Sequence, residues 1–250
     1  MILQSIFIFV FGLVFGSFIS ALTWRYPRRI SVAKGRSICP NCKGPIRWFD
    51  NIPLFSFIFL KGKCRQCRKP ISVRYPLIEL TTGLGFLFLS RLLFSNYFEF
   101  IYSLIILLIL ISIFVIDLEN KIIPDSFTFF GIFVVSVYYL IFNPQSLMML
   151  FLIGLTSSLL LLCINLATKG RGMGLGDVKF AVLGGLLVGP RFFLIWLLLA
   201  FLTGAVVGII LILGKKAGLK SQIAFGPFLV FAVPLVLLYG EKILFWLHLS

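Results

Sequence analysis

Long runs of apolar residues without charged side chains recur along the whole of this chain. Only 12% of the 250 residues are charged and 60% are hydrophobic, which is not the composition of a soluble domain. The runs do not alternate between apolar and polar residues, as the strands of a membrane barrel do. The sequence therefore predicts an all-α polytopic membrane protein. About eight transmembrane helices are expected, over residues 2–24, 77–94, 98–116, 126–142, 147–166, 178–189, 192–213 and 223–240.

The basic residues are concentrated in one segment. Residues 25–75 hold 13 of the 23 Lys and Arg residues and a single acid, Asp50. If this segment is cytoplasmic, both termini lie outside, and twenty basic residues fall in cytoplasmic segments against three outside. This asymmetry predicts a multi-pass protein of the inner (plasma) membrane. Topology and attraction to anionic lipid then explain the net charge of +15, so membrane lipid is an expected partner and nucleic acid is not.

This topology divides the chain into three parts. Residues 1–24 form the first transmembrane helix, residues 25–76 form a cytoplasmic cysteine-rich loop between helices one and two, and residues 77–250 form a membrane-embedded domain. Any catalytic function is expected in the third part, because its acidic residues stand at helix ends.

The loop carries two Cys-x-x-Cys pairs, in "CPNCKGP" and "CRQCRKP", with 21 residues between them. Two such knuckles offer the four thiolates of a tetrahedral structural zinc site. A cytoplasmic loop lies in a reducing compartment, which disfavours disulfides. A redox dithiol or four unpaired thiols remain as alternatives. The predicted zinc ligands are Cys39, Cys42, Cys64 and Cys67, and Cys163, in an apolar span, is expected to be a small packing residue.

Three of the eight acidic residues stand at the ends of apolar runs. Asp117 follows the run 98–116, and Asp177 opens the run 178–189. The predicted topology places both at the cytoplasmic side, so they can share one membrane depth. Asp125 follows a proline, and its side chain is expected to cap the first amides of the next helix.

Two carboxylates in one desolvated pocket hold a single proton between them, which is the chemistry of an aspartic protease. The ionised acid takes a proton from water, and the protonated acid polarises the scissile carbonyl. The stretch "KGRGMGLGDVKF" places Gly174 and Gly176 directly before Asp177. Glycines allow an extended peptide backbone to come close and permit unusual φ angles. A flexible linker or a pair of membrane-edge charges would explain each feature alone. Together they favour a catalytic pair, Asp117 and Asp177, with the two glycines as substrate contacts.

Glu79 lies one turn into the second predicted helix, five residues after Arg74. It is expected either to pair with a nearby base or to contact the substrate.

These motifs resemble those of the type IV prepilin peptidase family, membrane aspartyl proteases of the Gly-x-Gly-Asp class. "GMGLGDVKF" is similar to the family signature. "FGSF", "NIPLFS" between the cysteine pairs, "ISVRYPLIEL", "DLENKIIPD" and "FGPFL" follow in the family's order over nearly the whole chain. The resemblance implies that Asp117 and Asp177 are the two catalytic aspartates and that Asp125 is the acid of the Pro-Asp element.

The resemblance also implies a substrate and a second activity. The family cleaves the short basic leader from type IV prepilins or pseudopilins at the cytoplasmic membrane face, just after a glycine. Many members then N-methylate the new amino terminus with S-adenosylmethionine, a function associated with the cysteine-bearing loop. This chain has Ser20 where the family often has Asn, and Ala224 where it often has Pro. The inside acids Asp50, Glu79 and Glu119 are candidates to hold the charge of the leader.

Two other functions compete with this prediction. A membrane metal or small-solute transporter could use acids and thiolates as an ion pathway, but it predicts acids near the bilayer midplane and inverted-repeat halves. A membrane scaffold with a zinc knuckle for partner binding leaves the glycine-rich loop before Asp177 unexplained.

Overall fold

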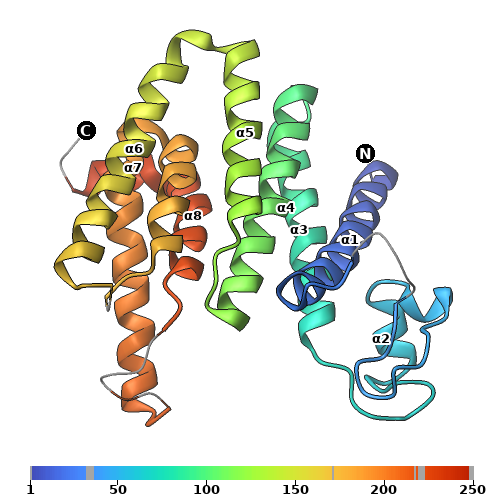
Figure 1. Cartoon of the computed structure of the whole chain (residues 1–250). Coiled ribbons are helices and arrows are strands. Elements are labelled where there is room, and N and C mark those ends of the chain that lie inside the picture. Colours follow the sequence, from blue (N-terminus) through green and yellow to red (C-terminus); the bar gives the residue numbers. More distant parts are fainter. Residues whose placement is uncertain (1, 32–36, 171, 217, 219–222, 248–250) are drawn as a thin grey trace. The chain divides into compact units, whose positions relative to one another are not determined.

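The computed structural model describes residues 2–31, 37–170, 172–216, 218 and 223–247. Its regular structure over these residues is helical, apart from two isolated bridges in the first loop. Seven of the described helices are long and apolar enough to cross a membrane, which confirms the predicted all-α membrane class. They are α1 (Ile2–Arg25), α3 (Arg74–Leu93), α4 (Tyr97–Asn120), α5 (Asp125–Phe142), α6 (Pro144–Ala167), α7 (Leu175–Leu213) and α8 (Gly226–Trp246) (Figure 1).

The count of seven differs from the eight predicted runs because the sixth and seventh are joined in α7. This element of 39 residues is interrupted at Gly189, which has a left-handed φ of 70° and is followed by Pro190. Glycine adopts this conformation without steric cost, and proline removes the amide that would continue the helical hydrogen bonding.

The interruption turns the chain back on itself. The rings of Phe180 and Trp196 have their centroids 6.5 Å apart, whereas a straight helix would separate these residues by roughly 24 Å. Residues 175–188 and 190–213 are therefore two antiparallel helical segments, and the predicted boundary at "VGPRFF" falls at the reversal.

The chain forms two compact units, Met1–Ser112 and Ile113–Ser250, with their boundary inside α4. In the first unit α1 packs closely on α3. A Cβ atom built on Gly12 would lie 2.8 Å from the Cα atom of Gly83. One built on Gly16 would lie 2.6 Å from the Cα atom of Glu79. Small residues at these crossings let two membrane helices approach, as is typical of helix pairs in lipid.

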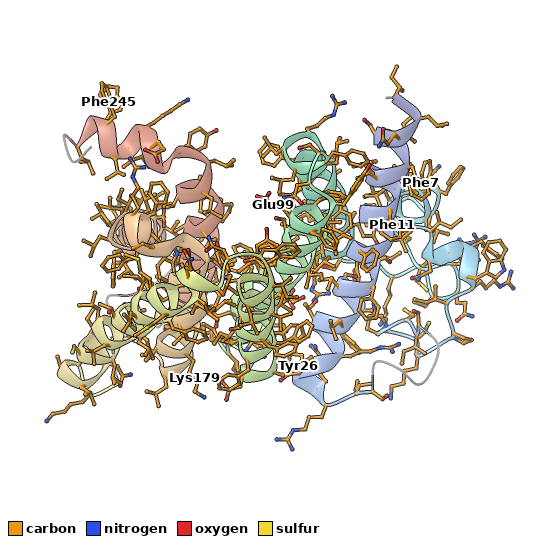
Figure 2. All side chains as sticks on the ribbon, turned by 90° about the horizontal axis from the view of Figure 1, so that it is seen from above. Phe7, Phe11, Tyr26, Glu99, Lys179 and Phe245 are labelled. Carbon is orange, nitrogen blue, oxygen red and sulfur yellow. The ribbon has the colours of Figure 1, made fainter. Side chains whose placement is uncertain are left out.

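The second unit uses the same device where α6 meets α7. A Cβ atom built on Gly185 would lie 2.7 Å from the Cα atom of Gly154. In both units many large apolar side chains point outward, as lipid-facing helices require. Figure 2 shows Phe7 and Phe11 projecting from α1 and Phe245 from α8. Cys163 is also exposed on α6, so its predicted place in the packing is wrong.

Candidate active site

Asp117 stands on the last turn of α4. The Lys121 amide donates a hydrogen bond to the Asp117 carbonyl oxygen at 2.8 Å, and Lys121 has a left-handed φ of 57°, so the helix ends just beyond the aspartate. The side chain points inward, and Asp117 is only 4% exposed. A helix end therefore presents a buried carboxyl group within the second unit.

The start of α8 lies against this carboxyl group. The backbone amide of Gly226 faces it, and a Cβ atom built on Gly226 would lie 2.5 Å from Asp117 Oδ2. Among the residues that the structure describes, Asp117 Oδ2 is the one buried side-chain oxygen or nitrogen without a hydrogen-bond partner. Such an atom in a native protein calls for an explanation, and a catalytic role is one.

Asp177 stands in the first turn of α7, and it too is buried, with 7% exposure. Its Oδ2 atom accepts a hydrogen bond of 3.0 Å from the amide of Gly174, the N-cap residue. This is the carboxylate half of a capping box, and glycine has no side chain to supply the other half. The hydrogen bond and the helix dipole both favour a carboxylate at this position.

The structure brings the two predicted catalytic residues together. Their carboxyl groups are close enough to interact electrostatically. The side chain of Ile123, in the turn after α4, fills the space beside both. A Cβ atom built on Gly226 would lie 2.8 Å from Ile123 Cδ1, and one built on Gly176 would lie 3.1 Å from Ile123 Cβ. Side chains at either glycine would therefore collide with the wall of the site.

The glycine-rich loop before Asp177 is tied to the end of α6. Asn165 donates a hydrogen bond from Nδ2 to the carbonyl oxygen of Met173. The Gly172 amide donates to Thr168 Oγ1 at 3.1 Å. Both bonds tie residues 172 and 173 back to the end of α6, so this part of the loop is not a free linker.

Among the described glycines of this loop, one has a φ angle that favours glycine. Gly170 has a left-handed φ of 73°, whereas Gly174 has a φ of −80°. The other glycines of the motif are needed for space: a Cβ atom at Gly172 would meet Thr168, and one at Gly176 would meet Ile123. Whether Gly174 and Gly176 contact a substrate stays a prediction.

Asp125 makes a contact that the sequence did not predict, and its role as a helix cap stays a prediction. It is the first residue of α5, with Pro124 at the N-cap position, and its carboxylate forms an ion pair of 2.7 Å with Lys179 Nζ. The pair links the start of α5 to the first turn of α7, two residues beyond Asp177, and both side chains are about half exposed.

An apolar groove of about 820 Å³ lies in the second unit, lined on α4 by Phe114, Leu118 and Lys121 and not by Asp117 itself. The residues that flank Asp117 on α4 contribute one wall, the second segment of α7 another, and the start of α8 a third. Its few polar side chains are Thr203 and two lysines, Lys121 and Lys216. The other lining residues are Phe114, Leu118, Leu202, Val206, Val207, Leu211, Ile223, Ala224, Pro227, Phe228 and Phe231.

The first unit contains the four predicted metal ligands as one cluster. The sulfur atoms of Cys39, Cys42, Cys64 and Cys67 all lie within 4.8 Å of one another, and those of Cys39 and Cys67 are 4.0 Å apart. Sulfur atoms on a tetrahedral zinc ion lie roughly 3.8 Å apart, because each Zn–S bond is about 2.3 Å long. The donor set and its convergence therefore fit a metal such as zinc.

The two knuckles have the same backbone hydrogen bonds and the same left-handed residue. In the first, the Cys39 amide donates to Gly44 O at 3.0 Å and the Lys43 amide to Cys39 O at 2.9 Å. In the second, the equivalent bonds join Cys64 with Lys69 and Arg68, both at 2.9 Å. Lys43 and Arg68 each have a left-handed φ of 56°. Each turn thus aims two sulfur atoms at one point.

The amides of these turns also favour a thiolate. Burial of Cys39 opposes ionisation, but hydrogen bonds from the backbone of Cys42 and Asn41 outweigh it and lower the pKa of Cys39 to about 7. At Cys42 the backbone hydrogen bond of Gly44 favours the thiolate, but burial and the neighbouring Cys39 and Cys67 outweigh it and raise the pKa to about 11. Without a metal, the thiolate therefore forms at Cys39 rather than at Cys42, although a metal ligand must lose its proton.

Two of the acids considered for the leader peptide already have contacts in the first unit. Asp50 forms a bidentate ion pair with Arg65, with a shortest distance of 2.7 Å. Glu79 is buried, accepts a hydrogen bond of 2.9 Å from the Leu54 amide and is also hydrogen-bonded to the Ser17 side chain. A substrate contact by Glu79 stays a prediction.

Sequence reasoning from spacing alone missed Ile123, Gly226 and the loop anchors Asn165 and Thr168. A signal existed for two of them, since Gly226 lies in "FGPFL" and Ile123 in "DLENKIIPD". For Asn165 and Thr168, polar side chains in the last turn of an apolar helix were the available signal.

Two family models and several known proteins match this chain. Residues 10–92 match the family model described as "Bacterial Peptidase A24 N-terminal domain", and residues 104–209 match "Type IV leader peptidase family". The chain is 32% identical to the "Prepilin leader peptidase/N-methyltransferase" of Aeromonas hydrophila. The alignment is 268 positions long and covers 96% of this chain and 92% of that protein. It is 34% identical to the protein of that name from Myxococcus xanthus over 225 residues, which cover 88% and 67% of the two chains. The corresponding Bacillus subtilis protein is 29% identical over 237 residues, covering 95% of each. No solved structure matches the chain.

Proposed function

Because the chain belongs to the type IV leader peptidase family, we propose that it is a membrane aspartic endopeptidase that removes the short basic leader from type IV prepilins or pseudopilins. The observation that carries the proposal is the pair of buried, interacting carboxyl groups of Asp117 and Asp177 at facing helix ends. Cleavage takes place at the cytoplasmic membrane face. In the proposed reaction one of the two aspartates is ionised and the other is protonated.

The pair acts with one shared proton. The ionised carboxylate takes a proton from a water molecule, whose oxygen attacks the carbonyl carbon of the scissile peptide bond. The protonated carboxyl group gives its proton to the carbonyl oxygen, so that a neutral tetrahedral diol forms. Collapse of the diol returns a proton to the leaving nitrogen and releases the leader as a carboxylic acid. The Gly174 amide holds the Asp177 carboxyl group by its hydrogen bond, and the Gly226 amide faces that of Asp117.

The apolar groove of the second unit is the proposed place for the apolar segment of the precursor that follows its leader. Its lining is almost entirely hydrophobic, and it includes Leu118, the residue after Asp117, and Pro227, the residue after Gly226. Lys121 and Lys216 line it as well, so the positive charges of a leader would be repelled there. The leader therefore extends away from this groove.

The proposed orientation follows from the charges. With both termini outside, the cysteine-bearing loop, Asp117 and Asp177 are all on the cytoplasmic side of the inner membrane, where positive residues predominate. Zinc at the four cysteines is proposed as a structural ion that fixes the loop, since the thiolates form a closed four-sulfur set.

A second activity, N-methylation of the new amino terminus, is proposed from the names of the relatives. S-adenosylmethionine would supply the methyl group. The described residues do not single out a site for it, and no step is assigned to a residue of this chain.

One experiment tests both activities. The purified protein in lipid nanodiscs is incubated with a recombinant type IV prepilin, with and without S-adenosylmethionine, and the product is analysed by intact-mass spectrometry. We expect loss of the leader in both reactions and one added methyl group only with the methyl donor. A precursor that stays intact with folded, metal-loaded enzyme would overturn the peptidase proposal. Cleavage without the added methyl group would overturn the second activity alone.

A further inference from the structure

Four large apolar side chains of the first loop are exposed together, and we propose that they anchor the loop in the cytoplasmic leaflet of the membrane. They are Trp48, Phe55, Ile58 and Phe59, named here the loop patch. Their exposed fractions are 81%, 57%, 71% and 80%. Leaving such side chains in water is costly, at about 25 cal/mol per Å² of apolar surface. Several large exposed apolar side chains on adjoining elements are typical of a membrane or partner site.

The loop patch lies on two short elements that are fastened together. Trp48 opens the 3₁₀ helix η2 (Trp48–Asn51), and the other three side chains belong to α2 (Phe55–Phe59). Ser56 Oγ donates to the carbonyl oxygen of Phe49 at 3.0 Å, which joins the two elements. Figure 1 shows α2 at the end of the α1–α3 pair that carries the loop.

Glu79 fixes the depth of the loop patch. Its Oε2 atom accepts the hydrogen bond from Leu54, the residue that precedes α2. Glu79 lies five residues after Arg74, the first residue of α3, which is roughly 7 Å along that helix. This distance matches the depth of about 5–10 Å at which interfacial helices lie. The start of α2 therefore lies beside the first turns of α3, at the depth of an interfacial helix, and not beyond the end of α3.

The same contact explains why a carboxylate is buried there. An amide at the start of a helix has no partner within the helix, and in lipid an unpaired amide costs several kcal/mol. Leu54 also has a φ of 59° and a ψ of −49°, a conformation rarely adopted by a residue with a side chain. The Glu79 carboxylate satisfies the amide and holds this turn, so Glu79 is a positioning residue for the loop patch.

The charges near the loop patch select lipid as its occupant. Lys61 and Lys63 follow α2 directly, and the segment 25–75 has 13 basic residues and one acid. Long basic side chains at this position reach the phosphate groups of anionic lipids, while their stems cover apolar surface. Tryptophan is likewise favoured at the membrane interface. The first unit thus offers an apolar face with a basic border, at the depth of the lipid head groups.

The test uses the fluorescence of Trp48. The full chain is placed in nanodiscs of phosphatidylcholine and phosphatidylglycerol, and the Trp48 signal is the difference between the wild-type protein and Trp48→Phe. We expect emission at a short wavelength, quenching by lipids brominated near the head-group end of their acyl chains, and little quenching by acrylamide in water. The other three tryptophans, Trp24, Trp196 and Trp246, are present in both proteins and cancel in this difference. Quenching by acrylamide alone would mean that the patch is in water, and protection from both quenchers would mean that protein covers it. Either result overturns the proposal.

Glu79 variants test the positioning role. Glu79→Gln keeps an oxygen that can accept the Leu54 hydrogen bond, whereas Glu79→Leu does not. We expect the lipid quenching of Trp48 to be retained in Glu79→Gln and lost in Glu79→Leu, with zinc content measured in both. Equal lipid quenching in the two variants would overturn the role of Glu79. The wild-type measurement tests the anchor even if Glu79→Leu fails to fold, and neither depends on peptidase activity.

Discussion

Gly226 lies so close to Asp117 that a Cβ atom on the glycine would be 2.5 Å from the Oδ2 atom of the aspartate. Gly226→Ala should therefore displace the Asp117 carboxyl group or the start of α8 by a fraction of an ångström to about 1 Å. A misplacement of this size can cost on the order of 10²-fold in rate. We expect kcat/KM for prepilin cleavage to fall by that order, while insertion and thermal stability change little.

Gly208→Ala is the matched control on α7. A Cβ atom at Gly208 would meet only Ile223 Cδ1, at 3.8 Å, which is an ordinary contact. This variant should keep its activity and gain up to about 1 kcal/mol of helix stability. Equal activity of the two variants would show that the close approach of Gly226 to Asp117 has no catalytic consequence.

The Asp125–Lys179 ion pair should matter little for catalysis, because both side chains are about half exposed. Exposed pairs of this kind contribute roughly 0–1 kcal/mol. Asp125→Asn and Lys179→Gln should each keep most of the prepilin cleavage measured by gel shift. The exchange of charges in Asp125→Lys/Lys179→Asp should restore whatever either Asp125→Lys or Lys179→Asp loses alone. Complete loss of cleavage in Asp125→Asn would assign Asp125 a direct part in the reaction.

The cysteine cluster should hold about one zinc ion per chain, because four converging thiolates complete one tetrahedral site. Removing one ligand from each knuckle in Cys39→Ser/Cys64→Ser should release the metal, as measured by elemental mass spectrometry of the purified protein. We expect cleavage to fall partly, through loss of order in the loop, and any methylation to fall further. Cys163→Ser is the control, since Cys163 lies on the exposed face of α6 and outside the cluster. Zinc that persists without both knuckles would place the metal elsewhere and support a transporter.

The features that the sequence predicts well are those that depend on residues close together in the chain. The apolar runs, the paired cysteines and the aspartates at helix ends are each visible within a short window, because a helix of the required length or a knuckle turn is a local structure. The boundary at Gly189 and Pro190 is local as well. The reversal of the chain at these residues is harder to predict from a short window, because it is seen in the contact of Phe180 with Trp196, 16 residues further along the chain.

The features that the sequence does not reveal arise from contacts between distant segments. Glu79 accepts a hydrogen bond from Leu54, and nothing in the neighbourhood of either residue indicates the other. The same holds for Asp125, whose position at a helix start predicts a cap but does not indicate Lys179, 54 residues away, as its ion-pair partner. A local preference such as capping is worth about 1 kcal/mol and is readily overridden by tertiary structure.

Asp117 and Asp177 provide the decisive prediction. Asn has nearly the shape of Asp but cannot hold or release the shared proton. If the pair activates water, Asp117→Asn and Asp177→Asn should each lower cleavage by on the order of 10⁴-fold or more. Both variants should still insert in the membrane and bind the precursor, as measured by crosslinking in nanodiscs. The double variant should be little worse than either single one, because groups that act as a unit are strongly non-additive.

In the wild-type enzyme the rate should rise and then fall with pH, since only the singly protonated pair is active. Normal cleavage by Asp117→Asn with an inactive Asp125→Asn would move the catalytic role to Asp125. Full activity of Asp177→Asn would remove the glycine-rich loop from the active site altogether.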